Sequence, residues 1–173
     1  MKVELSALLK QASAPFNPFI TQYLTLKTQP FYVQKLSCVL LVDDDQTTNY
    51  LTRLLLTRLH ITDKVLVAHN GREALALLAE HCHAPNAPRC PALILLDVNM
   101  PVMNGFEFLG AYAQLPETQR QAIVVVMLTT SLHPQDVERA RHLQVAAFLS
   151  KPLTSQHLTD MLGQHFPASM GIQ

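Results

Sequence analysis

The sequence LILLDVNMPVMNG, residues 93–105, decides the fold, because four apolar residues run without interruption into Asp97 before the chain turns through Pro101 and Gly105. An apolar run that does not alternate with polar residues is typical of a strand buried on both faces, as in a parallel sheet covered by helices. In open sheets of this kind, binding and catalytic groups lie at the carboxyl ends of the strands. Asp97 is therefore a candidate for chemistry, although a lone aspartate can equally end a strand and begin a turn.

Other segments repeat this strand pattern, and helical patterns separate them. Further strands are predicted at 38–42, 64–69, 122–131 and 145–150. Apolar residues at helical spacing predict helices at 46–59, 72–82, 104–114, 133–143 and 154–165. The alternation predicts a doubly wound α/β domain with a five-stranded parallel sheet of order 2-1-3-4-5, the flavodoxin-like arrangement. In this order the first, third and fourth strands are neighbours, so their carboxyl ends share one crevice.

The helical patterns also predict which side chains face the core. These are Leu51, Leu54, Leu55 and Leu59 in the first helix, Ala74, Leu75, Leu77 and Leu78 in the second, and Phe106, Leu109 and Ala113 in the third.

The length of 173 residues suits one domain with an extension. We expect an N-terminal extension at 1–36, with a short helix at 2–12 and then irregular chain, a globular domain at 37–166 and a tail at 167–173. Because few residues follow the last predicted helix, we expect no attached output domain.

The charge pattern gives little reason to expect nucleic acid or a membrane surface as a partner. Basic and acidic residues balance at 13 each. The extension carries four lysines and one glutamate, a net +3, which leaves 9 basic and 12 acidic residues in the remainder. No apolar run approaches the roughly 18 residues that span a bilayer, and Glu4 and Lys10 interrupt any signal-peptide core. We therefore expect a cytoplasmic protein.

Three cysteines at irregular spacings favour free thiols in a reducing compartment over a disulfide framework. Cys82 and Cys90 with His81 and His83 offer the ligand types of a zinc site, but their spacing fits no ordinary zinc motif. We interpret this segment as a helix end and a loop.

Polar residues gather at the predicted carboxyl ends of the strands. They are Asp43 and Asp44 after the first strand, Asp97 after the third, Thr129 and Thr130 after the fourth, and Lys151 after the fifth. Clustered carboxylates repel one another unless a cation neutralises them, and Mg²⁺ suits oxygen ligands of this kind. With such an ion present, Asp97 can accept a phosphoryl group while Lys151 neutralises charge and Thr129 donates a hydrogen bond.

Four segments carry a specific resemblance. VDDD (42–45), LLDVNMPVMNG (95–105), MLTTS (127–131) and FLSKP (148–152) resemble the signature segments of bacterial response-regulator receiver domains, over residues 37–166. The resemblance implies that Asp97 is the phosphoacceptor and that Asp43, Asp44, Asp97 and the Asn99 backbone carbonyl hold Mg²⁺. It also implies that Thr129 and Lys151 contact the phosphoryl group.

The same resemblance implies a signalling role. The phosphoryl donor is expected to be a sensor histidine kinase or a histidine phosphotransfer protein, and the chain catalyses only its own phosphorylation and dephosphorylation. Thr129 and Phe148 are the expected switch residues, although this family often has Tyr where Phe148 stands. Output is expected through contacts with an unknown downstream protein. The face formed by the fourth helix, fifth strand and fifth helix, which includes His133, Glu138, Arg139 and Arg141, is also a candidate homodimer interface.

Two alternatives stay open at this point. Asp43, Asp45 and Thr47 fit the DxDxT pattern of haloacid-dehalogenase-like phosphohydrolases, in which Asp43 would be the nucleophile and Asp45 the general acid. No acidic pair of the later motif follows Lys151, however, and the chain has no room for a cap domain. The other alternative is a phosphorylation-independent interaction module of receiver shape.

Overall fold

The apolar runs form a parallel five-stranded sheet of order β2-β1-β3-β4-β5, which confirms the predicted topology. The structure, a computed structural model, describes residues 35–83, 87–120, 122–130, 139, 143 and 145–166. The strands are β1 (Val39–Val42), β2 (Val65–Ala68), β3 (Leu93–Asp97), β4 (Val124–Thr129) and β5 (Ala147–Ser150). Every neighbouring pair is parallel, so all five carboxyl ends lie along one edge.

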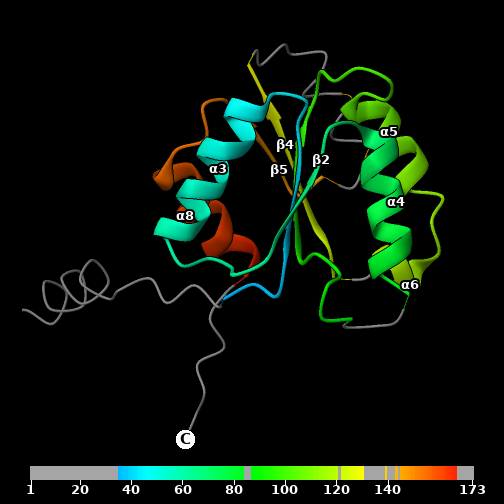
Figure 1. Cartoon of the computed structure of the whole chain (residues 1–173), viewed down its shortest axis with the longest axis horizontal. Coiled ribbons are helices and arrows are strands. Elements are labelled where there is room, and N and C mark those ends of the chain that lie inside the picture. Colours follow the sequence, from blue (N-terminus) through cyan, green and yellow to red (C-terminus); the bar gives the residue numbers. More distant parts are fainter. Residues whose placement is uncertain are drawn as a thin grey trace, which may run out of the picture. The chain divides into compact units, whose positions relative to one another are not determined.

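Helices cover both faces of this sheet (Figure 1). One side carries α3 (Gln46–Arg58) and α8 (Ser155–His165), and the other carries α4 (Gly71–His81), α5 (Gly105–Tyr112) and the short α6 (Glu117–Arg120). The predicted helix at 2–12 and the tail at 167–173 lie outside the described residues. The predicted helix at 133–143 lies outside them too, apart from Arg139 and Leu143.

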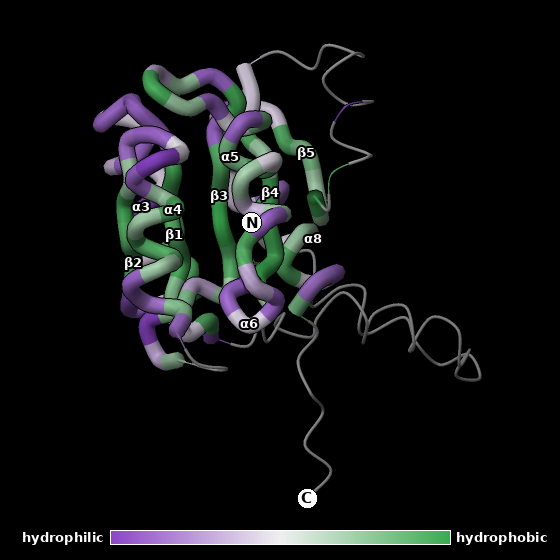
Figure 2. The backbone as a smooth tube through the Cα atoms, turned by 90° about the vertical axis from the view of Figure 1, so that its right-hand side faces the viewer, coloured by the Kyte–Doolittle hydropathy of each residue, from purple (hydrophilic) through white to green (hydrophobic). Residues whose placement is uncertain are grey.

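The strands are apolar except for the polar residues that end β3, β4 and β5, because the faces of the sheet lie in two cores. Leu40 and Val42 pack with α4 and α5, whereas Val39 and Leu41 pack with α3 and α8. Figure 2 shows the strands of the central sheet largely in the colours of hydrophobic residues. Burying one such aliphatic side chain contributes about 1.5–3 kcal/mol, so the two cores hold the strand ends in place.

Side-chain caps begin the four long helices α3, α4, α5 and α8, each in the loop that follows a strand. Asp45 caps α3, Asn70 caps α4, Asn104 caps α5 within a reciprocal capping box with Glu107, and Thr154 caps α8. These caps satisfy backbone N–H groups that have no partner inside the helix. They also fix where each loop at the carboxyl edge of the sheet ends.

The inward faces of two helices differ from the prediction. Leu51 and Leu54 are 56% and 52% exposed, whereas the buried residues of α3 are Asn49, Thr52 and Leu56. The prediction was wrong because α3 carries leucines on more than one face, and spacing alone does not select the face that packs. On α5, Ala113 is exposed as well, while Phe108 and Tyr112 are buried.

The expectation of three free thiols was also wrong. Cys82, the C-cap residue of α4, forms a disulfide with Cys90 in the segment before β3, and only Cys38 is free. The two residues are eight positions apart in sequence, but the turn between them brings their Cα atoms to 4.8 Å. A separation of this size is within the range that a disulfide can bridge.

Candidate functional site

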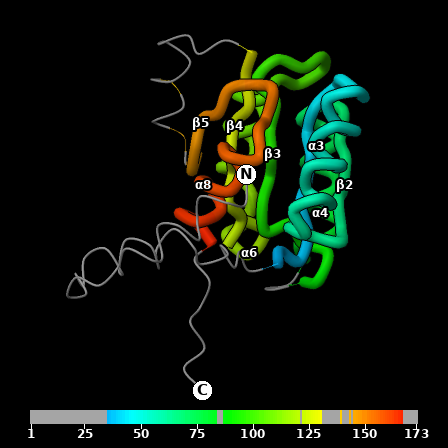
Figure 3. Tube along the Cα trace, turned by 90° about the vertical axis from the view of Figure 1, so that its left-hand side faces the viewer, coloured from blue at the N-terminus to red at the C-terminus, as the bar shows by residue number. Residues whose placement is uncertain are grey.

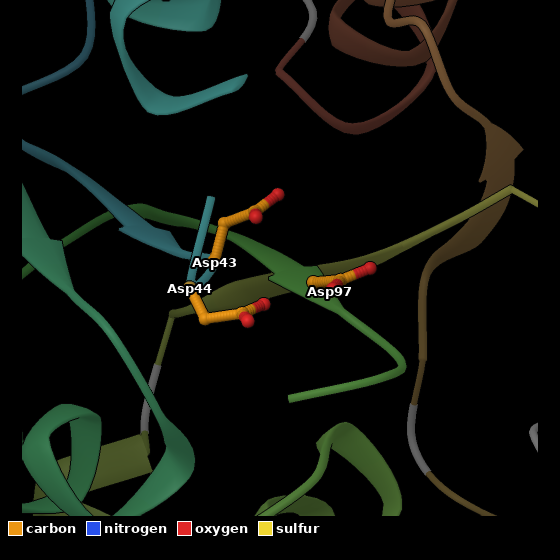
Figure 4. Close-up of side chains that lie close together, drawn as sticks. All are labelled: Asp43, Asp44 and Asp97. Atoms are coloured by element: carbon orange, nitrogen blue, oxygen red, sulfur yellow. The ribbon is translucent and has the colours of Figure 1, made fainter. Parts of the chain in front are cut away.

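Three carboxylates meet at the edge of the sheet where the strands end (Figure 4). Asp43 and Asp44 follow β1, and Asp97 is the last residue of β3. One oxygen of each side chain lies within 4.8 Å of the others. Asp43 and Asp97 are buried, whereas Asp44 is exposed to solvent. The sequence therefore identified three acids that the fold does bring together.

Lys151 joins this group from the residue after β5. Its Nζ atom lies 2.5 Å from Oδ2 of Asp43 and 2.8 Å from Oδ1 of Asp97. Burial alone lowers the pKa of Lys151, but its hydrogen bonds and the charges of the two carboxylates together raise that pKa above its ordinary value. Lys151 is therefore a fixed ammonium group that neutralises part of the carboxylate cluster.

Asp97 is the carboxylate whose ionisation is most disfavoured. Burial raises its pKa, the nearby charge of Asp43 raises it further, and the hydrogen bond from Lys151 acts in the opposite direction. The backbone next to Asp97 is fixed on both sides, because the Val98 N–H donates to the Leu128 carbonyl and the Val98 carbonyl accepts from the Gly105 N–H. The Asp97 carboxylate is thus carried by a well-anchored end of the sheet.

Asp45 has a different task from the two acids before it. Its side chain accepts hydrogen bonds from the N–H groups of Thr47 and Thr48 at 2.7 and 3.1 Å, and these bonds lower its pKa. It is exposed and is not one of the three clustered carboxylates. The carboxylate that the phosphohydrolase alternative uses as a general acid is thus committed to capping α3.

The remaining predicted residues surround the cluster at different depths. Thr129 ends β4 and is buried, and its carbonyl accepts the Lys151 N–H at 2.7 Å. Phe148, on β5, is half-buried against the core that contains α5. Asn99 is exposed just after β3, and no hydrogen bond from another described residue occupies its carbonyl. The carbonyl of Asn99 is thus available to a ligand.

Two further residues position the site: Asn49, which was not singled out from the sequence, and Gly105, which was predicted only as part of a turn. Asn49 is buried on α3 and donates from Nδ2 to the Asp43 carbonyl at 2.8 Å. A Cβ atom on Gly105 would lie 2.4 Å from the Asp97 carbonyl oxygen, so only glycine allows α5 to begin this close to β3. A polar residue on the inner face of an otherwise leucine-rich helix is the signal that would have identified Asn49.

An apolar groove of 590 Å³ opens beside the carboxylates. Its polar end includes Asp97 and Lys151, and its apolar walls are Leu51, Leu54 and Leu55 of α3 with Pro152 and Leu153 of the connection to α8. Figure 3 shows the side of the sheet covered by α3 and α8, to which these walls belong. The exposed leucines of α3 thus lie next to the site rather than in the core.

Comparison with known proteins agrees with this geometry. Residues 39–163 match the family model of the response regulator receiver domain. The chain belongs to this family. Response regulator Rcp1 of Synechocystis is 36% identical over 123 residues, which cover 71% of this chain and 80% of Rcp1. Receiver domains act in two-component signalling and are not classical enzymes.

Solved receiver structures share the fold as well. A two-component response regulator from Cytophaga hutchinsonii superimposes with a TM-score of 0.69 at 30% identity, over 76% of this chain and 98% of that one. The Mn²⁺-bound form of Rcp1 gives 0.55 at 31% identity, over 76% and 96%. Among the described residues of this receiver, no helix is long and apolar enough to cross a bilayer.

Proposed function

We propose that this chain is the phosphoacceptor of a two-component phosphorelay, and that Asp97 accepts a phosphoryl group from a sensor histidine kinase or a histidine phosphotransfer protein. The observation that carries this proposal is the double contact of Lys151 with Asp43 and Asp97 inside a cluster of three carboxylates. A lone structural aspartate would need neither the acids nor the ammonium group. The contacts match the demands of phosphoryl transfer, which are a nucleophile, neutralising charge and a hydrogen-bond donor.

In the transfer step, a carboxylate oxygen of Asp97 attacks the phosphorus atom of a phosphohistidine. The new P–O bond forms as the P–N bond breaks, and the imidazole leaves with the electron pair. Lys151 is already held beside Asp97 and would neutralise the transferred oxygens. The Thr129 hydroxyl would donate a hydrogen bond to one of those oxygens. Hydrolysis of the acyl phosphate by water would restore Asp97.

The residues present fit a divalent cation. The three carboxylates supply hard oxygen ligands within 4.8 Å of one another, and the Asn99 carbonyl is free of hydrogen bonds from other described residues. We assign Asp43, Asp44, Asp97 and the Asn99 carbonyl to Mg²⁺, which commonly keeps positions for water and phosphate oxygens. When bound, the ion supplies neutralising charge to the phosphoryl oxygens. The relative Rcp1 has been solved with Mn²⁺.

The groove beside Asp97 is the surface on which we expect the phosphohistidine protein to dock. Leu51 and Leu54 are large apolar side chains that are more than half exposed, and they lie within one groove with Asp97. An apolar helix face that carries the donor histidine would cover them and bring the imidazole to the carboxylate. Burial of such side chains typically provides the central affinity of an interface.

Signal output is proposed to pass through protein contacts rather than DNA or membrane binding. Phosphorylation would draw the Thr129 hydroxyl toward Asp97 and allow the half-buried Phe148 to repack. The described part of the adjoining face includes Arg139, whose guanidinium lies 4.4 Å from the centroid of the Phe106 ring. An unknown downstream protein, or a second copy of the chain, would read this face.

Chemical phosphorylation tests the phosphoacceptor. The full chain is incubated with Mg²⁺ and acetyl phosphate, and the adduct is located by intact mass and peptide mapping. We expect one hydroxylamine-sensitive adduct on Asp97 that is absent from Asp97→Asn and retained in Asp160→Asn, which changes an exposed acid on α8. An adduct on Asp43 with sustained phosphatase turnover supports the phosphohydrolase instead. No adduct with any donor supports a phosphorylation-independent module.

Substitution in the groove tests the docking surface. The double variant Leu51→Ser/Leu54→Ser should reduce the rate of transfer from a phosphohistidine protein by about tenfold or more at limiting concentrations, since each tenfold corresponds to the loss of about 1.4 kcal/mol of interface contacts. Its rate with acetyl phosphate should stay unchanged, because the small donor does not need the groove. Tyr50→Ser is the matched control, since Tyr50 is 66% exposed on α3 and does not line the groove. Equal loss with both donors contradicts this docking surface.

A further inference from the structure

A second group of reactive atoms lies at the end of β3 opposite Asp97. The Cys82–Cys90 bridge joins the end of α4 to the segment that enters β3 at Leu93, whereas Asp97 is the last residue of that strand. Figure 1 shows the connection between α4 and β3 at the opposite edge of the sheet from the start of α3. Chemistry at this bridge is therefore spatially separate from the carboxylate site.

The three cysteines differ in access to solvent. Cys82 is fully buried and packs in the core beside Leu78, whereas Cys90 is only half-buried. Cys90 is thus the residue of the pair that is partly exposed to solvent, and we expect a thiol or a disulfide in solution to react there first. Cys38 is 1% exposed, and burial raises the pKa of its thiol, which keeps it protonated and unreactive. The bridged pair and Cys38 should therefore respond very differently to a thiol reagent.

The bridge is also the tie between a surface turn and the core. The end of α4 is held without it, because the Cys82 N–H donates to the Leu78 carbonyl at 2.8 Å. The entry to β3 is held as well, because the Ala92 N–H donates to the Cys38 carbonyl at 3.0 Å. Between them, the Cys90 N–H donates to the Ala87 carbonyl at 2.9 Å within the turn 87–90. Among the described residues, no hydrogen bond links this turn to a helix or a strand.

We propose that Cys82 and Cys90 are a reversible dithiol–disulfide pair, in which oxidation fixes the turn 87–90 against the end of α4 and reduction releases it. The consequence is a surface hollow that exists only in the oxidised form of the protein. A hollow of 370 Å³ is walled by Glu80, His81 and His83 from the end of α4 and by Ala87, Pro88 and Arg89 from the turn. Because its two walls belong to the two sides of the bridge, the hollow keeps its form only while the bridge is closed.

The bridge would form by thiol–disulfide exchange with a small disulfide such as oxidised glutathione. The Cys90 thiolate attacks one sulfur of the small disulfide, which forms a mixed disulfide and releases one small thiolate. The Cys82 thiolate then attacks the Cys90 sulfur, which forms the protein disulfide and releases the second small thiolate. The protein loses two electrons and two protons, and the oxidant is reduced to two thiols. Excess small thiol reverses both steps, beginning at the accessible Cys90 sulfur.

Redox titration of the full chain tests the pair. The protein is equilibrated in buffers of different reduced-to-oxidised glutathione ratios, quenched with acid, alkylated and weighed as the intact chain. We expect the Cys82–Cys90 pair to change from dithiol to disulfide in one two-electron transition, at a glutathione ratio between fully reduced and fully oxidised buffer. Cys38 should be alkylated only after denaturation. Cys38→Ser, the matched control, should titrate like the wild type, and the transition should vanish in Cys90→Ser, which changes a half-buried position. A pair that stays reduced in oxidised glutathione alone, or stays oxidised in excess reduced glutathione, overturns the proposal.

Hydrogen exchange tests the structural consequence in the wild-type chain, without any substitution. Reduction should speed exchange at the amides of Ala87, Arg89 and Cys90 by tenfold or more and leave the amides of β3 unchanged. The midpoint of thermal unfolding should fall by roughly 5–10 °C, as expected when a short covalent loop is opened. Equal exchange in the two redox states would show that the bridge does not control the turn and would overturn the proposal. Neither measurement depends on phosphorylation of Asp97.

Discussion

Asp97 is a buried acid beside two other acids, and ionising it in this position costs stability. Its raised pKa means that the folded protein holds the Asp97 proton more tightly than the unfolded chain does. The stability contributed by this proton is fully present below the pKa that Asp97 has in the unfolded chain. It is lost as the pH rises through the pKa that Asp97 has in the folded protein. At neutral pH, the ionised carboxylate therefore destabilises the fold.

Asp97→Asn should raise the free energy of unfolding at pH 7 by on the order of 1 kcal/mol, because it removes a charge that is disfavoured by burial and by the neighbouring charge of Asp43. The advantage should shrink as the pH falls through the raised pKa of the folded Asp97 carboxyl, and it should be lost below the unfolded value of about 3.9. Urea denaturation at both pH values measures the difference. Asp63→Asn, at an exposed position away from the cluster, should show no such pH-dependent gain. A variant less stable than the wild type at pH 7 contradicts the prediction.

At the scale of single residues, the sequence predicted which charged side chains meet at the sheet edge better than it predicted the residues that position them. Asp43, Asp44, Asp97 and Lys151 were identified because the type of residue at each strand end already limits its chemistry. Asn49 was missed because its task depends on which face of α3 packs inward. The pairing of Cys82 with Cys90 was missed because it depends on a tertiary distance that no spacing rule contains.

At the scale of elements, strands were more predictable than helix faces. A strand of a doubly covered sheet is apolar on both faces, so the run itself identifies it. On α3, leucines point both to the core, as Leu56 does, and to solvent, as Leu51 and Leu54 do. The pattern could not distinguish the face of α3 that packs on the sheet from the face that is exposed, because both carry leucines.

The junction of β3 and α5 offers a test at this scale. Gly105→Ala would place a methyl group 2.4 Å from the Asp97 carbonyl oxygen and 3.1 Å from Cα of Val98, so the backbone must shift. We expect a loss of roughly 2–3 kcal/mol in the free energy of unfolding, together with slower phosphorylation by acetyl phosphate, because Asp97 moves with this backbone.

Gly110→Ala is the matched control for that substitution. Gly110 lies on the same helix, and a Cβ atom there meets nothing within 4 Å. Alanine in a helix interior is favoured over glycine by up to about 1 kcal/mol, so this variant should be as stable as the wild type or more stable. Similar destabilisation by both alanines would show that the close approach of Gly105 to β3 is not what matters.

At the scale of the whole molecule, the metal site joins loops after different strands and should therefore stabilise the entire domain. Binding of Mg²⁺ at a concentration 100 times its Kd adds about 2.7 kcal/mol to the free energy of unfolding, which raises the Tm of a domain of this size by roughly 10 °C. Calorimetry in EDTA and in excess Mg²⁺ measures the shift. Asp44→Asn, at the exposed acid of the cluster, should reduce it more than Asp160→Asn does. An identical Tm with and without Mg²⁺ contradicts the assignment.

The strand β3 has a consequence for how many forms this small protein can take. Its carboxyl end is Asp97, and its amino end begins three residues after Cys90, so a single strand of about 17 Å separates the proposed phosphorylation site from the proposed redox pair. Neither mark would hinder the other sterically. If the two modifications form independently, one domain has four covalent forms. The doubly modified form would then arise only where a phosphoryl signal and oxidising conditions coincide.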